Sequence, residues 1–142
     1  MGKLWVVGVD GSPNARSALG WALRHGADAG ATVRVVTAYT WPGPRWFDPA
    51  PPSQERANAH HVQDGEIDAV MVDREIVPAL ERWVVEGEPG NVLVEAAAEE
   101  DLLIVGSRGR GRLSEALLGS IAEDCLRRSV APVVVIPSSV CV

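Results

Sequence analysis

Cysteine, long apolar runs and positive charge are all scarce in this chain. The two cysteines, Cys125 and Cys141, lack the spacing of metal ligands, so the sequence predicts neither a disulfide framework nor a zinc site. No apolar run approaches the roughly 18 residues of a transmembrane helix, and the first residues show no signal-peptide layout. The net charge of −6 argues against a nucleic-acid partner. We therefore expect one cytoplasmic domain over residues 1–142, with no nucleic-acid or membrane partner.

Familiar catalytic motifs are also missing. A Walker loop needs a Gly-Lys-Ser/Thr ending, and the chain has Gly111-Arg112-Leu113 instead. No G-x-G-x-x-G follows the first expected strand, which argues against a Rossmann dinucleotide site. His60 and His61 are adjacent, so on a helix they point to different faces and cannot form an i, i+4 metal pair. We expect no catalytic residue and no protein metal site.

Apolar runs alternate with helical patterns along most of the chain. Ser12 and Pro13 are typical of a helix N-cap and first helical residue, and this helix is predicted to stop near Gly30. Another helix is expected over residues 54–77, interrupted or weakened at Gly65. The alternation predicts a three-layer α/β fold. The expected strands are 4–9, 32–38, 81–86, 102–105 and 133–136, and the remaining helices are expected to begin at residues 89 and 120.

Glycines gather where the fourth expected strand passes into the last helix. Gly106 and Gly109 follow the apolar run 102–105, and Gly119 and Ser120 precede the helical pattern. Glycines let backbone N–H groups approach an anion closely, and a helix N-terminus adds partial positive charge. The segment therefore predicts a phosphate cradle. The alternative is that these glycines only turn the chain.

The spacing G-x2-G-x9-G-S resembles the nucleotide-binding signature of the universal stress protein family, in its ATP-binding branch. The resemblance extends to residues 7–13 and 131–137 and leaves about 40–78 unmatched. It implies a three-layer α/β/α sandwich, with a five-stranded parallel sheet of order 3-2-1-4-5 like that of the adenine nucleotide alpha-hydrolases. It also implies bound ATP or another adenine nucleotide with Mg²⁺. Family members commonly form homodimers through the last strand, here Val133 to Ile136. The alternative is a monomer in which Pro132, Pro137 and the tail protect this edge.

In a sheet of this order, a crevice opens at the carboxyl ends of the first and fourth strands, where Asp10 and Gly106 both lie. A carboxylate repels phosphate, so Asp10 is expected to face the adenosine end of the nucleotide, as the resemblance also implies. The alternative is an Asx turn that bonds the amides of Gly11 and Ser12, and both roles are compatible. For Ala38, the resemblance alone implies a backbone contact with the adenine edge.

The glycine-rich loop is expected to hold the phosphates. Gly106 is placed near the ribose and the first phosphates, and Gly109 with the amide of Arg110 near the outer ones. Ser120 offers a hydroxyl to the ligand, and its competing role is to cap the last helix in a capping box with Glu123.

Three arginines, at positions 108, 110 and 112, form a basic patch in this acidic chain. They either contact phosphate or form an ordinary solvated turn. The complete predicted nucleotide site comprises Val9, Asp10, Ala38, Gly106, Ser107, Arg108, Gly109, Arg110, Gly119, Ser120 and Ile121.

Residues 41–53 hold five prolines and three large aromatic residues, so they do not form regular structure. This segment is either a lid over the crevice or an ordered surface loop packed on a helix. We expect an ATP-binding stress-response regulator, in which ATP orders residues 40–53 and 108–120 and an unknown protein partner reads the result. The alternatives are a slow ATPase and a nucleotide-independent interaction protein of the same fold.

Overall fold

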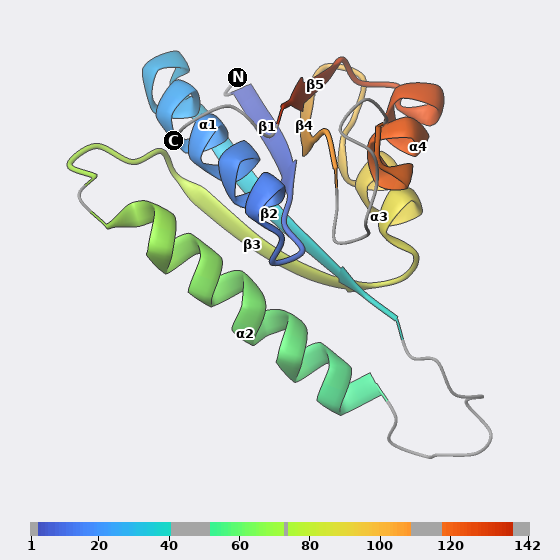
Figure 1. Cartoon of the computed structure of the whole chain (residues 1–142). Coiled ribbons are helices and arrows are strands. Elements are labelled where there is room, and N and C mark those ends of the chain that lie inside the picture. Colours follow the sequence, from blue (N-terminus) through green and yellow to red (C-terminus); the bar gives the residue numbers. More distant parts are fainter. Residues whose placement is uncertain (1–2, 41–51, 73, 109–117, 138–142) are drawn as a thin grey trace.

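In a computed structural model of the chain, one five-stranded sheet forms the centre (Figure 1). The structure describes residues 3–40, 52–72, 74–108 and 118–137. The paired strands are parallel and their order across the sheet is β3-β2-β1-β4-β5, which confirms the predicted fold. The strands are β1 (Lys3–Gly8), β2 (Ala31–Tyr39), β3 (Leu80–Glu86), β4 (Leu102–Gly106) and β5 (Val133–Ile136).

Helices cover both faces of this sheet. α1 and α2 pack on one face and α3 and α4 on the other (Figure 1). Within the described part of the chain, no helix has the length and apolar content that a membrane crossing requires. The helices are α1 (Pro13–Ala29), α2 (Pro52–Met71), α3 (Pro89–Ala96) and α4 (Ser120–Arg128).

The ends of α1 confirm the capping prediction. The hydroxyl of Ser12 accepts a hydrogen bond from the N–H of Ala15 at 3.2 Å, and Pro13 is the first helical residue. The helix ends at Ala29, directly before Gly30. This start places the N-terminus of α1 immediately after the turn that leaves β1.

The predicted bounds of α2 are wrong. The helix begins at Pro52 rather than Gln54 and ends at Met71 rather than Val77. It runs through Gly65, so the predicted interruption is also wrong, whereas the predicted weakening stays a prediction. A side chain at Gly65 would meet no atom within 4 Å, so the glycine costs the helix only propensity, about 1 kcal/mol. Ile67 and Val70 follow within one turn and pack into the core. Because tertiary packing outweighs a single glycine, the helix continues.

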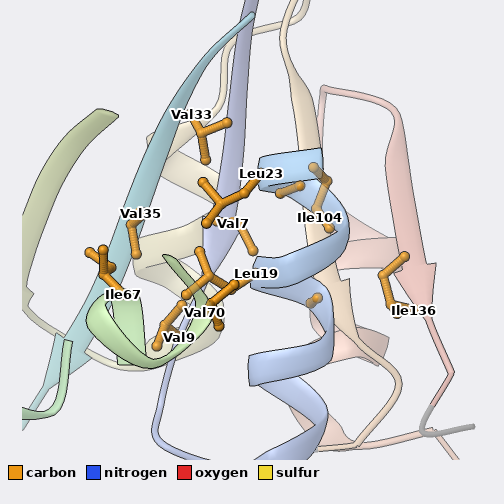
Figure 2. Packing of buried hydrophobic residues seen from close by; sticks show 12 residues of the cluster. Val7, Val9, Leu19, Leu23, Val33, Val35, Ile67, Val70, Ile104 and Ile136 are labelled. Atoms are coloured by element: carbon orange, nitrogen blue, oxygen red, sulfur yellow. The ribbon is translucent and has the colours of Figure 1, made fainter. Parts of the chain in front are cut away.

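Two apolar cores lie on the two sides of the sheet. Figure 2 shows the first, in which Leu19 and Leu23 of α1 cluster with Val7 of β1 and Ile67 of α2. The second core joins α3 and α4 to the opposite face. Since the central strands are buried on both faces, their sequences are continuous apolar runs, which is why they could be predicted.

Cys125 of α4 lies fully buried in the second core. Burial, together with the nearby Asp124 carboxylate, raises the pKa of its thiol from 9.0 to about 11. The unfolded chain therefore loses this proton at a lower pH than the folded protein does. The resulting stability is fully present below pH 9 and is lost as the pH rises to 11.

We expect this thiol to lower the free energy of unfolding by roughly 2–3 kcal/mol between pH 9 and 11. Few other groups titrate near this range, because the chain has one lysine, one tyrosine and one further thiol, Cys141. Urea unfolding at several alkaline pH values measures the fall, and Cys125→Ala should remove most of it. An equal fall in the variant would show that other groups cause it.

Candidate functional site

The carboxyl ends of β1, β2 and β4 open onto a cavity of about 60 Å³. These strands are neighbours in the sheet, and the strand order reverses between β1 and β4. α3 contributes Leu93 to the lining, and α4 contributes Ile121 and Ala122. Most lining side chains are apolar, which suits a flat, weakly polar group such as a nucleobase.

The cavity brings together predicted site residues from separate parts of the sequence. The ones that line it are Val9, Asp10, Ala38, Gly106, Arg108 and Ile121. Ser107 and Ser120 are sequence neighbours of lining residues, and Gly119 precedes Ser120, but none of the three is part of the lining. Gly109 and Arg110 lie outside the described residues, as does most of segment 41–53. The contacts that these residues make with a ligand stay a prediction.

Asp10 lies in a tight turn at the end of β1. Its Oδ1 accepts a hydrogen bond from the N–H of Ser12 at 2.9 Å, which confirms an Asx turn to that amide. Gly11 between them has a φ of 85°, a conformation that costs glycine little. A carboxylate has acceptor sites for several hydrogen bonds, so Asp10 keeps capacity for a ligand hydroxyl.

The first residues after β4 are tied to other elements by hydrogen bonds. The N–H of Ser107 donates to the carbonyl of Ile136 at 2.9 Å, and the Ser107 carbonyl accepts from the N–H of Gly119 at 2.8 Å. The N–H of Arg108 donates to Oδ1 of Asn14. Because these main-chain donors are engaged within the protein, Arg108 offers a ligand its side chain rather than its amide.

Asn14 is the main residue that the sequence analysis missed. It is the second residue of α1, a position that is ordinarily solvated, yet only 7% of it is exposed. Its Nδ2 donates to the Ile136 carbonyl at 3.2 Å. A Cβ on Gly106 would lie 2.9 Å from the carbonyl oxygen of Asn14. Close packing on α1 therefore requires glycine at position 106, whatever a ligand requires.

The N-terminus of α4 differs from the prediction. Gly119 is the N-cap and Ser120 is already the first helical residue, so the capping box of Ser120 with Glu123 is wrong. Instead, the N–H of Glu123 donates to the Gly119 carbonyl at 3.0 Å. Gly119 itself has no side-chain oxygen that could cap the first turn. The N–H groups and dipole at this end favour an anion.

A second cavity, of about 280 Å³, lies between the end of β2 and the N-terminal half of α2. Asp10 and Ala38 line both cavities, so the two adjoin at the carboxyl ends of β1 and β2. The second lining is more polar and includes Thr37, Glu55 and Asn58. Sequence analysis did not identify these residues, because α2 follows a segment without a recognisable pattern. Across the described residues, no group of three or more possible metal ligands occurs.

Comparison with known proteins gives a consistent family. The sequence profile of the universal stress protein family matches residues 3–137. A universal stress protein of Mycobacterium tuberculosis is 31% identical over 140 residues, which cover 97% of this chain and 49% of that protein. The chain spans about half the length of the curated relatives it matches.

Solved structures of similar fold include two with nucleotides. A universal stress protein crystallised in complex with cAMP is 29% identical, with a TM-score of 0.73, and the match covers 96% of this chain and 98% of that one. A family protein of Arabidopsis thaliana with AMP bound is 17% identical, with a TM-score of 0.61, covering 94% and 90%. At that identity, the second likeness concerns the fold alone.

Proposed function

Because the chain belongs to the universal stress protein family, we propose that it binds an adenine nucleotide, ATP with Mg²⁺, at the carboxyl ends of β1, β2 and β4. The observation that carries the proposal is that residues from distant segments line the same cavity. These residues are Asp10, Ala38, Gly106 and Arg108. The cAMP in a relative of 29% identity supports the ligand class.

The order of the strands gives the nucleotide a direction across the sheet. Ala38 on β2 lies at one end of the lining, Asp10 after β1 lies between, and Arg108 after β4 lies at the other end. We place the base near Ala38, where the lining is apolar. The Asp10 carboxylate then accepts from ribose hydroxyls, and Arg108 with the N-terminus of α4 faces the phosphates.

Mg²⁺ is proposed to enter with the phosphates. Within the described residues, no cluster of carboxylates or histidines could hold a metal ion by itself. Mg²⁺ keeps several waters and is usually held by phosphate oxygens with one or two carboxylates. Bound in this way, the ion would neutralise phosphate charge.

We propose that the protein acts by binding the nucleotide and not by catalysing its hydrolysis. A protein partner is proposed to recognise the nucleotide-bound form. Among the described lining residues, the ionisable side chains are Asp10 and Arg108. Asp10 already accepts from Ser12, and neither side chain forms a base–nucleophile pair that would orient water. Phosphate release from ATP at about 1 s⁻¹ or faster would contradict this part.

We also propose a homodimer through β5. Among the described strands, β5 lies at the edge of the sheet and pairs with β4, and an apolar edge tends to pair with another chain. The N–H of Ser107 bonds the Ile136 carbonyl and that of Leu103 bonds the Pro132 carbonyl. Backbone N–H and C=O groups of successive residues point to opposite sides of a strand. The N–H and C=O groups of Val133 and Val135 therefore point away from β4, toward the open edge of the sheet. A purely monomeric protein in sedimentation equilibrium would overturn the dimer.

Calorimetric titration of ATP, AMP, cAMP and GTP, each with Mg²⁺, tests the nucleotide site. We expect micromolar binding of at least one adenine nucleotide, and we expect GTP to bind at least about tenfold more weakly. Asp10→Asn keeps the acceptor for the Ser12 amide and removes the charge, so it should weaken adenine nucleotide binding about tenfold.

The matched control is Asp28→Asn, an exposed residue near the opposite end of α1. It makes the same change in net charge and should leave the affinity within about twofold of the wild type. Equal weakening by both variants would mean that net charge, not Asp10, governs binding. No binding of any adenine nucleotide to folded, nucleotide-free protein would overturn the proposed function.

A further inference from the structure

We propose that Asn14 is the positioning residue of the nucleotide crevice: its side-chain amide fixes the start of the loop after β4 against α1 and β5. The inference rests on the proposed function, because it concerns how the same crevice is held in shape. Asn14 does not line the cavity itself and acts through Arg108, which does.

Every polar atom of the Asn14 side chain is used in this junction. Nδ2 donates to the carbonyl of Ile136 at the end of β5, at 3.2 Å. Oδ1 accepts from the Ser107 hydroxyl at 3.2 Å and from the N–H of Arg108. One amide therefore joins three elements that lie far apart in the sequence and side by side in the fold (Figure 1).

The main chain of Asn14 takes part in the same junction. Gly106, the last residue of β4, packs so closely on Asn14 that an added Cβ would lie 2.9 Å from its carbonyl oxygen and 3.0 Å from its Cγ. Only 7% of Asn14 is exposed, so water does not readily replace its hydrogen bonds. The side chain and the close contact together fix both the position and the direction of the chain leaving β4.

This junction determines what the loop presents to a nucleotide. The N–H groups of Ser107 and Arg108 bond Ile136 and Asn14, and the N–H of Gly119 bonds the Ser107 carbonyl. The same bonds hold the start of the loop beside the N-terminus of α4. Asn14 thereby sets where Arg108 lies relative to the first turn of α4. These are the two groups proposed to face the phosphates.

Two measurements on Asn14→Ala test the inference. The first is amide hydrogen exchange by NMR in the nucleotide-free protein, and the second is calorimetric titration of ATP with Mg²⁺. We expect exchange at the Arg108 amide to become about tenfold faster or more, and ATP affinity to fall about tenfold, because a buried hydrogen bond to the loop is lost. Asn91→Ala is the control, since Asn91 is exposed, accepts a hydrogen bond from Arg128 and is not among the residues that line the cavity.

Asn14→Asp separates the two halves of the amide. The carboxylate keeps the acceptor for the Arg108 N–H but loses the donor to Ile136. We expect the Arg108 amide to stay protected in this variant while ATP affinity still falls, because β5 is released and a negative charge is added near the phosphates. This variant also keeps the inference testable if Asn14→Ala does not fold.

Three results would overturn the inference: unchanged Arg108 exchange in Asn14→Ala, faster exchange with unchanged ATP affinity, or equal losses in Asn91→Ala. Failure of the proposed function has a different signature. In that case the wild-type protein binds no adenine nucleotide, and the exchange rates still decide whether Asn14 holds the loop.

Discussion

Gly106→Ala is expected to lower the free energy of unfolding by about 1–3 kcal/mol even when no nucleotide is present. The added methyl group would lie 2.9 Å from the carbonyl oxygen of Asn14 and 3.0 Å from its carbonyl carbon. Both are backbone atoms, so β4 and α1 must move apart. Because this movement shifts the start of the loop, we also expect nucleotide affinity to fall about tenfold or more. Urea unfolding and calorimetry measure the two effects.

Gly65→Ala is the matched control for this substitution. Gly65 lies inside α2, where an added Cβ would have no neighbour within 4 Å. Alanine is the better helix former, so this variant should gain up to about 1 kcal/mol of stability. If Gly106→Ala keeps full stability and loses only nucleotide binding, then the ligand, not Asn14, is the reason for glycine at position 106.

Gln63→Ala is expected to destabilise the protein by about 2–4 kcal/mol. Gln63 of α2 is fully buried, and its Nε2 lies 3.1 Å from the Val35 carbonyl, 3.1 Å from Thr37 Oγ1 and 2.9 Å from the Trp83 carbonyl. One amide group thus attaches α2 to β2 and β3. Truncation removes these bonds and leaves a cavity beneath the helix.

Gln54→Ala, in the same helix, provides the comparison. Gln54 is exposed and its Nε2 donates to Oδ1 of the exposed Asn58 at 3.0 Å, so its loss should change stability by about 0.5 kcal/mol or less. The Oε1 atom of Gln63 has no partner among the described residues, so Gln63→Leu should cost less than Gln63→Ala. Similar stability of the variants at positions 63 and 54 would show that α2 is held by its apolar residues alone.

The fold was predictable because its strongest signals are local. Apolar strands buried on two faces differ clearly from an amphipathic helix such as α1, whose start Ser12 and Pro13 define. The strand order was not available from periodicity and came from the family resemblance. Because the resemblance supplied this strand order, Asp10 and Arg108 could be expected at the same crevice, and both line one cavity. Their contacts with a ligand stay a prediction.

The remaining features depend on contacts that no local pattern reports. The role of Asn14 exists only because β4 and β5 end beside the first turn of α1. Gln63 falls in a helix of mixed polarity, where an amide usually faces water. Gly119 rather than Ser120 became the N-cap of α4, since either residue type is acceptable there and the Gly119 N–H bonds Ser107.

Residue-resolved NMR titration of the ¹⁵N-labelled protein with ATP and Mg²⁺ tests the central claim most directly. If a nucleotide occupies the proposed crevice, the largest amide shifts will fall at Asp10, Ala38, Ile121 and Ala122, which line one cavity. The amide of Gly30, beyond the far end of α1, should change little. Shifts centred elsewhere, or no shifts at saturating ATP, would contradict the account.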